Sequence, residues 1–239
     1  MAESPRERYR RRLEALEQRP LNLDLSRRGE YTREAGWNID DYEADLPPEP
    51  PGEPLPGGSF RAAQEVLREY RFPPPDLITG IFLPERPLEQ RVMLLEGRFL
   101  GFTFFFGVRV GGVVDELRET RQGLERVWGY DYATLEGHFE RGQIEFTVAK
   151  RLDSGEVFFR IHAFSRTGTI RNPFYALGFR LFGRRLQRRF AHESMRRVQR
   201  LVQEKLATGR AGGEAPPVQP ASAQPAAEAR MEELAEDRR

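Results

Sequence analysis

The first feature of this sequence that could do chemistry is an alternating run of aromatic and hydroxyl side chains, WGYDYATL, at 128–135. In a β-strand, alternate residues share a face. Here that face would carry Trp128, Tyr130, Tyr132 and Thr134. Hydroxyl groups set among aromatic rings are typical of a pocket for a small, mainly apolar ligand. The alternative is plain packing against a helix or a neighbouring strand, since aromatic residues most often serve as core.

Four polar residues downstream could anchor such a ligand or exchange protons with it: His138, Glu145, Arg160 and His162. His138 lies in a predicted loop bounded by Gly137 and Gly142, where it could be a general base or a structural hydrogen-bonding group. Glu145 lies on the polar face of a predicted strand, so it would either face solvent or enter a pocket with a raised pKa. Arg160 and His162 share one face of the next predicted strand.

Several chemistries have no sequence support. The chain has no cysteine, which excludes disulfides and thiolate ligands or nucleophiles. His138, His162 and His192 are the three histidines, and they lack the spacing of metal ligands. The Gly-x-Ser-x-Gly elbow, the phosphate-binding loop and the dinucleotide fingerprint do not occur either. The sequence therefore predicts no metal and no cofactor, and it favours a binding protein over an enzyme.

The segment 171–200 is strongly basic, with nine arginines against one acid, Glu193. Segment 31–57 is acidic, with one arginine against seven acids, so the two segments could pair. Alternatively, the arginines could contact an anionic membrane surface, where each cation is worth about 1 kcal/mol. Arg184, Arg185, Arg188 and Arg189 would make that contact. Nucleic acid is not an expected partner, because no recognition motif is present and the whole chain carries only a net +1.

Residues 128–202 contain YATLEGH at 132–138, a glycine followed by a strand, Phe-Ser-Arg, and a glutamine on the last helix. Together these motifs resemble the uncharacterised protein family UPF-0548, a bacterial and plant domain of unknown function. The positions that carry the resemblance are Gly137, Gly142, Ser165, Arg166 and Gln187. The family's paired glutamates are replaced here by Gln143 and Ile144, and its proline after Ser-Arg is replaced by Thr167. The resemblance implies candidate positions but no activity.

The elements that must position these residues follow from periodicity and turn residues. Ser59 is a predicted N-cap for a helix over 60–71, which Pro73-Pro74-Pro75 ends. Strands are predicted at 41–46, 77–83, 90–96, 99–110, 113–119, 125–135, 143–151 and 156–165, with a hairpin turn at Asp153-Ser154-Gly155. Asn172 and Pro173 begin a long amphipathic helix that stops near Gly209.

This element order predicts an α+β domain in which a curved antiparallel sheet grips a long C-terminal helix, the START-like or helix-grip arrangement. The alternative is a small antiparallel barrel with the helix outside. Hydrophobic residues make up 38% of the 239, below the roughly 45–50% of globular chains, so part of the chain is expected outside the core. We predict a charged flank at 1–35, the domain at 36–208 and a disordered tail at 209–239. The tail and much of 1–30 are predicted to be dispensable for folding.

The first 19 residues are charged and lack an apolar signal core. The most apolar run, Phe99–Val108, is much shorter than the about 20 residues of a membrane helix, so a cytoplasmic, soluble protein is expected. The leading hypothesis is a non-enzymatic domain with a cavity for a small apolar ligand between the sheet and the last helix. A membrane- or protein-interaction module acting through the basic helix is the second hypothesis. An enzyme that uses His138 and Glu145 is the third.

Overall fold

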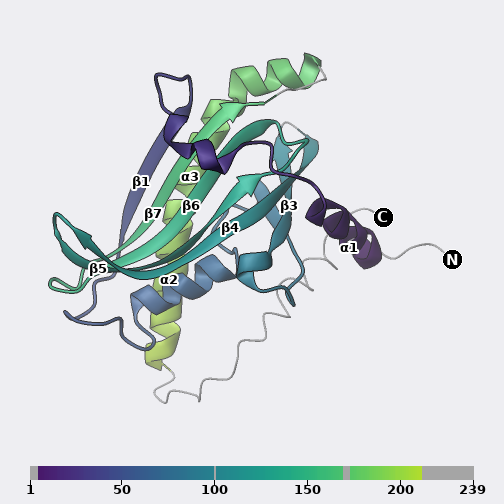
Figure 1. The fold of residues 1–239 in the computed structure, drawn as a ribbon. Coiled ribbons are helices and arrows are strands. Elements are labelled where there is room, and N and C mark those ends of the chain that lie inside the picture. The colour runs from purple at the N-terminus through teal and green to yellow at the C-terminus, as the bar shows by residue number, and fades with distance from the viewer. Residues whose placement is uncertain (1–4, 100, 169–172, 212–239) are drawn as a thin grey trace.

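The computed structural model describes residues 5–99, 101–168 and 173–211, and these form one seven-stranded antiparallel sheet with helices on both faces (Figure 1). The elements are α1 (Pro5–Glu17), η1 (Leu25–Glu30), β1 (Asn38–Leu46), α2 (Ser59–Arg68), β2 (Ile78–Ile81), η2 (Leu88–Gln90), β3 (Val92–Phe99), β4 (Phe102–Thr120), β5 (Gly123–Thr134), β6 (Glu140–Arg151), β7 (Val157–Thr167) and α3 (Pro173–Ala211). None of the described helices combines the length and apolarity needed to cross a membrane.

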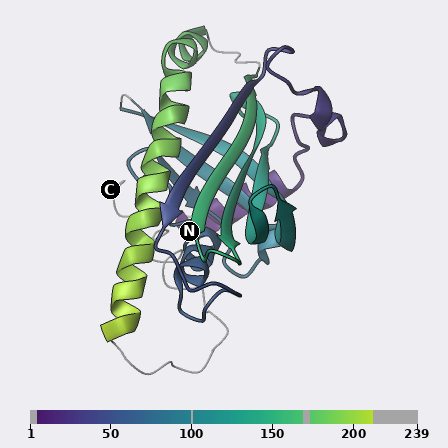
Figure 2. The same cartoon turned by 90° about the vertical axis from the view of Figure 1, so that its left-hand side faces the viewer.

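The strand order is β1-β7-β6-β5-β4-β3-β2, so β1 and β2 are the two edges and the sheet stays open. The predicted helix-grip arrangement is confirmed, and the alternative of a closed barrel is wrong. The sheet curves, and the long helix α3 runs along it beside β1 (Figure 2). We call the face that packs against α2 and α3 the inner face, and the opposite face the outer face.

The main core lies on the inner face, where the alternation of strand side chains puts apolar groups against the two helices. From the sheet it takes Tyr130, Phe146 and Phe159, each at most 1% exposed. From α3 it takes the predicted stripe, including Val198 and Val202, both fully buried. Burial of this stripe explains why the amphipathic C-terminal segment forms one continuous helix. The side chains of Phe179 and Phe182, which belong to the same predicted stripe, lie outside the described residues.

The chain between 102 and 120 forms one long strand, β4, although the sequence predicts two strands separated by Gly111-Gly112. The strand continues through a register shift between Val110 and Gly112, where it pairs with β5. A Cβ at Gly111 would crowd the carboxylate of Asp131, so a larger residue there would require that side chain to move. The two glycines therefore mark a β-bulge and not a loop.

The helix α2 begins one residue earlier than predicted, and Gly58 rather than Ser59 occupies the N-cap position. Gly58 has no side chain to cap the helix, and Glu49 supplies the missing acceptor. Its carboxylate accepts hydrogen bonds from the backbone N–H of Phe60 at 2.8 Å and of Leu55 at 3.0 Å. These hydrogen bonds hold the proline-rich segment 47–58 against the start of α2.

The N-terminal segment packs on the outer face, although the sequence predicts residues 1–35 as a charged flank. The helix α1 buries Tyr9, Leu13 and Leu16, which contact β2 and β3 in a second apolar cluster. Leu21 then forms a single antiparallel bridge with Leu135 at the end of β5. Most of the predicted tail at 209–239 lies outside the described residues, and α3 extends to Ala211.

Candidate functional site

The two tyrosines predicted to line a ligand site, Tyr130 and Tyr132, do lie on the inner face. The hydroxyl of Tyr130 donates to the backbone oxygen of Leu67 in α2, at 3.0 Å. The hydroxyl of Tyr132 lies 3.2 Å from that of Tyr70. Burial raises the pKa of Tyr132 to about 12, so this phenol stays protonated at neutral pH.

The paired hydroxyls of Tyr70 and Tyr132 carry two hydrogens, and the bond between them uses one. The second hydroxyl hydrogen has no acceptor in the described part of the chain. Tyr70 is held with a positive φ of 53°, and its ring occupies the space above Gly80. The pair is therefore a fixed hydrogen-bonding group in an apolar wall, with both side chains buried.

Further along the inner face, aromatic rings from β4 and from the β5–β6 connection form a second cluster. The ring centroids of Phe104 and Phe106 are 6.3 Å apart, and Phe139 meets Phe106 edge-on at 5.1 Å. His138 lies against Phe106 at 4.7 Å. All four side chains are half-buried, so the cluster keeps part of its apolar surface accessible.

His138 is arranged as a hydrogen-bond donor. Its Nδ1 accepts the backbone N–H of Glu140 at 2.9 Å, so the proton of the neutral ring lies on Nε2. Burial lowers the pKa of His138 to about 4, so the ring is neutral at physiological pH. The predicted alternative of a structural loop histidine fits this geometry, because the nitrogen that could accept a proton is already occupied.

A polar cluster closes this end of the inner face and joins β6, β7 and α3. The amide of Gln187 donates to the carboxylate of Glu140 and, at 3.1 Å, to the hydroxyl of Ser165. Burial raises the pKa of Glu140 to about 7; Arg184 opposes this shift and Asp40 adds to it. Glu140 therefore changes its protonation state within the physiological range.

Burial changes along the inner face from one end to the other. At the end near α2, Phe146 and Phe159 are fully buried. At the end near Glu140, the inner-face residues Phe106, Ile144 and Ser165 are only half-buried. We call this less covered region, together with the buried Tyr132 opposite Ile144, the inner-face site. It comprises Phe106, Tyr132, Glu140, Ile144, Ser165 and Gln187. Two residues of the resemblance, Ser165 and Gln187, belong to it.

Thr134 was predicted as a ligand contact, but its hydroxyl is already hydrogen-bonded within the protein. Its hydroxyl accepts the backbone N–H of Gly142 at 3.0 Å and lies 2.6 Å from the side-chain oxygen of Asn22. The amide of Asn22 donates to the backbone oxygen of Glu140 at 2.8 Å. Thr134 and Asn22 thus continue the ladder between β5 and β6 where the strands separate.

Thr134→Val is therefore expected to destabilise the protein by about 1–3 kcal/mol, because a buried backbone N–H loses its acceptor. The residue volume is nearly unchanged, so packing contributes little to the loss. Urea unfolding would measure the change against Thr103→Val, an exposed threonine of β4. Equal effects of the two substitutions would show that the Thr134 hydroxyl does not support the ladder.

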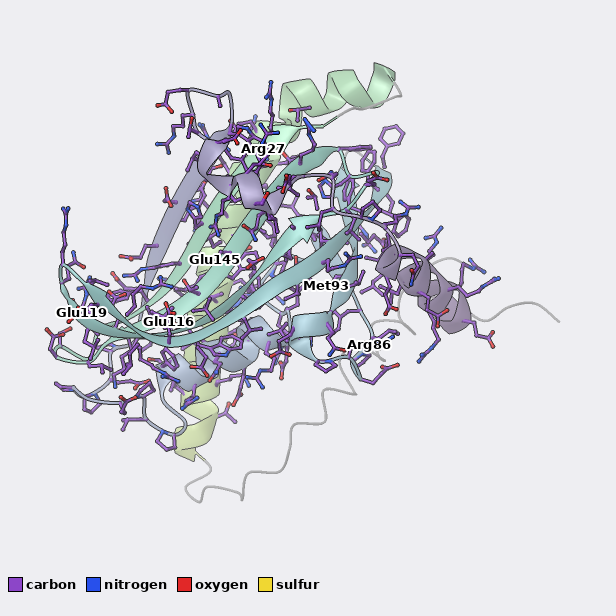
Figure 3. The ribbon with its side chains drawn as sticks, viewed as in Figure 1. Arg27, Arg86, Met93, Glu116, Glu119 and Glu145 are labelled. Atoms are coloured by element: carbon purple, nitrogen blue, oxygen red, sulfur yellow. The ribbon has the colours of Figure 1, made fainter. Side chains whose placement is uncertain are left out.

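Three of the predicted anchors lie on the other side of the sheet from the tyrosines. Glu145 is opposite His162 in the β6–β7 register, and its chain neighbour Phe146 faces the inner core. Strand alternation therefore puts Glu145, which is labelled in Figure 3, on the outer face. His162 lies on that face as well, because it is opposite Glu145 in the register. His162 contacts Asp41 there, at 2.7 Å. The sequence-based prediction of one cavity lined by both sets is corrected, because the two sets occupy opposite faces.

Arg160 is also on the outer face, in an ion-pair network. Its guanidinium donates to the carboxylate of Glu125 at 2.6 and 3.1 Å and to that of Glu43 at 2.6 Å. The hydrogen bond with Glu125 raises the pKa of Arg160, although burial opposes the shift. This arginine joins β1, β7 and β5 and has little capacity left for a ligand.

Backbone geometry explains the two glycines of the resemblance, Gly137 and Gly142. Gly137 has a φ of +90°, which disfavours any residue with a side chain. At Gly142, a Cβ would lie 2.4 Å from the backbone oxygen of Phe164 in β7. Gln143, which replaces one glutamate of the family's pair, donates to Asp131 at 2.6 Å on the outer face, and Ile144 faces the inner-face site.

Ser194 on α3 carries part of the family resemblance, but the sequence analysis did not propose it as a binding residue. Ser194 is fully buried in the apolar stripe, and its hydroxyl has no hydrogen-bond partner within the described residues. Its helical spacing from Phe190 and Val198 is the signal that could have identified it, because a serine there must face the core. The described residues contain no group of three or more side chains suited to holding a metal ion.

A family model for a domain of unknown function, DUF1990, matches residues 25–197. No curated protein matches the chain. Three solved structures are similar. Ara h 8.0201 is 12% identical over 71% of this chain and 99% of its own, with a TM-score of 0.41. A START superfamily protein from Mycobacterium smegmatis is 11% identical over 70% of this chain and 97% of its own, with a TM-score of 0.41, and the Zhui aromatase/cyclase from Streptomyces sp. R1128 is 14% identical over 75% and 99%, with a TM-score of 0.43. The fold itself is defined by the sheet and helix described above.

Proposed function

The chain belongs to the family of the domain of unknown function DUF1990, and we propose that it binds a small, mainly apolar ligand at the inner-face site, without catalysing a reaction. The observation that supports the proposal is the change in burial along the inner face. Fully buried core residues give way to half-buried Phe106 and Ile144 within one sheet. Apolar surface that stays accessible beside a well-packed core is what a ligand would cover.

The side chains around the inner-face site indicate the chemistry of the ligand. Phe106 and Ile144 offer apolar contacts, and the Tyr70–Tyr132 pair offers one hydroxyl hydrogen. Glu140 and Gln187 add a polar end whose protonation changes near neutral pH. A ligand with an apolar or aromatic body and one hydrogen-bonding group would satisfy both parts.

Native mass spectrometry of the full chain tests the proposal directly, because a bound molecule adds mass to the folded protein. For titration, we choose the fluorescent apolar probe 1-anilinonaphthalene-8-sulfonate. Ile144→Trp would fill the inner-face site and is expected to weaken probe binding at least tenfold. Leu117→Trp is the matched control, since Leu117 is 50% exposed on β4. Phe106→Ala, which removes an apolar contact without adding volume, is expected to weaken binding as well.

Binding should also depend on pH. The pKa of Glu140 is about 7, so raising the pH from 6 to 8 converts this group from mostly neutral to mostly ionised. The anionic probe should bind less tightly at pH 8, and Glu140→Gln should remove the pH dependence. If the full chain carries no ligand and binds the probe equally before and after Ile144→Trp, the proposal is wrong.

The basic helix supports the second candidate, an anionic membrane surface. Arg184 is paired with Asp40, and Arg189 with Asp76 and Glu193, so the fold already uses two of the four arginines. Arg185 and Arg188 are exposed and make no hydrogen bond or ion pair with the residues that the structure describes. Flotation with vesicles containing phosphatidylserine would test this candidate, with Arg185→Gln/Arg188→Gln as the variant.

A further inference from the structure

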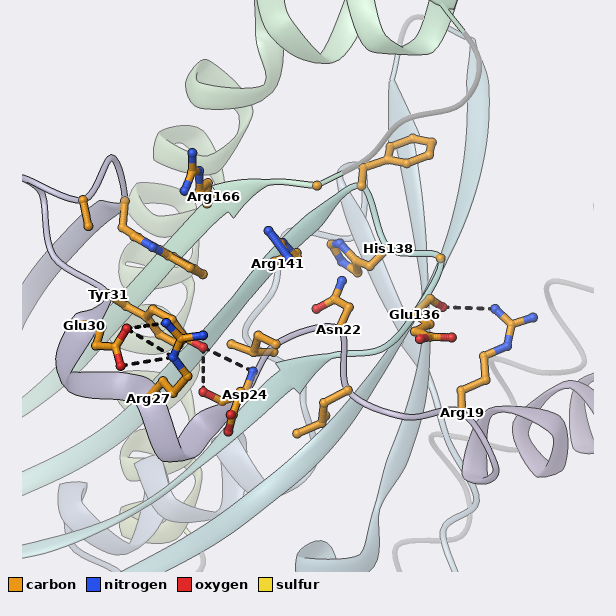
Figure 4. A pocket seen from close by; sticks show the side chains of 17 residues that line it. Arg19, Asn22, Asp24, Arg27, Glu30, Tyr31, Glu136, His138, Arg141 and Arg166 are labelled. Atoms are coloured by element: carbon orange, nitrogen blue, oxygen red, sulfur yellow. Dashed lines mark hydrogen bonds and ion pairs between the residues drawn. The ribbon is translucent and has the colours of Figure 1, made fainter.

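A pocket of about 1430 Å³ lies on the outer face, beneath the N-terminal segment (Figure 4). Its walls come from residues 19–37, from the connection between β5 and β6, and from the end of β7. Arg141 and Arg166 line it. Their chain neighbours Glu140 and Ser165 face the inner side, so strand alternation puts Arg141 and Arg166 on the opposite face from the inner-face site. His138 and Phe139, in the connection between β5 and β6, border both regions.

Arg141 of β6 and Arg166 of β7 are directly opposite each other in the strand register. Residues in that relation have Cβ atoms about 4.5–5.5 Å apart on the same face, and like charges there are destabilising. Both side chains are exposed, and neither makes a hydrogen bond or an ion pair with any residue that the structure describes. Two positive charges are therefore held together without a matching anion.

Arg27 and Asp24 of the pocket already have partners within it. Arg27 donates to the carboxylate of Glu30 at 3.1 and 2.6 Å. The carboxylate of Asp24 accepts from the backbone N–H of Ser26 at 3.0 Å and from its hydroxyl at 2.7 Å.

At the opposite end of the pocket from Arg141 and Arg166, Arg19 donates to the backbone oxygen of Glu136. Figure 4 shows Glu136 beside Arg19 and apart from the arginine pair. Of the four arginines that line the pocket, Arg19 and Arg27 have hydrogen-bond partners, and Arg141 and Arg166 have none among the described residues.

His138 adds an uncharged donor to the same pocket. Because its Nδ1 accepts the N–H of Glu140, its Nε2 carries the proton. An aromatic wall adjoins the arginines: Tyr31 stacks on Trp37 with ring centroids 4.2 Å apart, and Trp37 meets Phe164, two residues before Arg166, edge-on at 5.9 Å. The pocket thus offers cations at one side and flat apolar surface at another.

We propose that Arg141 and Arg166 bind the phosphate group of a small phosphate monoester, whose organic part lies against Tyr31 and Trp37. Two guanidinium groups match a phosphate dianion in charge, and each can donate two parallel hydrogen bonds to its oxygens. The pocket is much larger than an inorganic ion, which favours an ester over free phosphate. The proposal concerns the outer face and does not rest on the inner-face site.

Isothermal titration of the full chain with phenyl phosphate tests the proposal, and inorganic phosphate and benzoate serve as comparison ligands. Phenyl phosphate is expected to bind at least tenfold more tightly than either, since it alone combines a dianion with an aromatic body. Arg141→Gln and Arg166→Gln should each weaken binding at least tenfold. Arg121→Gln, an exposed arginine between β4 and β5, is the matched control and should change nothing.

Without ligand, Arg141→Gln and Arg166→Gln should raise the melting temperature by roughly 1–3 °C in low salt, because each removes a like-charge contact. A purely structural role for the two arginines would lower it. Equal binding of benzoate and phenyl phosphate would overturn the assignment to a phosphate ester, and equal binding of inorganic phosphate would overturn the role of the aromatic wall. Binding that survives both substitutions, or no binding of phenyl phosphate at millimolar concentration, would overturn the whole proposal.

Discussion

Lys150→Met is expected to lower the free energy of unfolding by about 3–5 kcal/mol, because it leaves the carboxylate of Glu49 buried without its cation. The ammonium of Lys150 lies 2.9 Å from the Glu49 carboxylate, and the two side chains are 0% and 3% exposed. Lys150 also donates to the backbone oxygen of Glu53 at 3.0 Å. One substitution therefore loosens the loop 47–58 and the start of α2 together.

The control is an ion pair that solvent screens. Arg118 and Glu116 lie 2.8 Å apart on β4 with side chains 43% and 50% exposed, so Arg118→Met should cost less than about 1 kcal/mol. Urea unfolding measures both variants. A double variant, Glu49→Gln with Lys150→Met, should lose less than Lys150→Met alone, because no charge then remains buried. A loss for Lys150→Met as small as that for Arg118→Met would contradict the buried pair.

The same pair predicts how stability depends on pH. Burial raises the pKa of Glu49, but hydrogen bonds from Leu55 and Phe60 and the charge of Lys150 together bring it below its usual value. A lowered folded-state pKa stabilises the protein above the pKa of the unfolded chain, and this stabilisation disappears as the pH falls through the folded value. Wild type should therefore lose stability below about pH 4.5 more steeply than Glu49→Gln.

Local pattern is enough to predict the fold, because period-two alternation and a long amphipathic segment specify a sheet with one covering helix. The sequence also puts Tyr130 and Tyr132 on the correct face. It does not tell which face each of the other strands turns inward, so Glu145 and His162 were grouped with residues on the opposite side. Which side chains of a strand face inward depends on its register with strands that are distant in sequence. That register cannot be derived from one sequence alone.

The binding roles of individual polar groups were harder to predict than their faces. Thr134 has the residue type of a ligand contact, but Asn22, 112 residues earlier, occupies its hydroxyl. Arg141 was not a candidate, because a lone arginine on a strand looks like ordinary surface. Its significance comes from Arg166 directly across the ladder. Tertiary pairing, rather than residue type, decides which polar groups are free.

The N-terminal helix supplies the second large effect, and here the structure reverses the expectation from composition. The cluster of α1 with β2 and β3 buries Leu13 to 1% exposure. β4 leaves room for α1 at Gly107, where a Cβ would lie 2.5 Å from a methyl of Leu16. The guanidinium of Arg109 donates to the backbone oxygens of Glu17 at 3.0 Å and Arg19 at 2.7 Å, which fastens the end of the helix.

A chain of residues 31–208 is therefore expected to melt well below the full chain, and not within a few degrees of it. Leu13→Ala alone should cost about 2–4 kcal/mol, because it removes a buried side chain and leaves a cavity. For a protein of this size, that loss lowers the melting temperature by roughly 5–15 °C. Glu14→Ala changes the exposed side of the same helix and should stay within about 0.5 kcal/mol. Equal melting temperatures for the Leu13 and Glu14 variants, measured by calorimetry, would show that α1 does not stabilise the sheet.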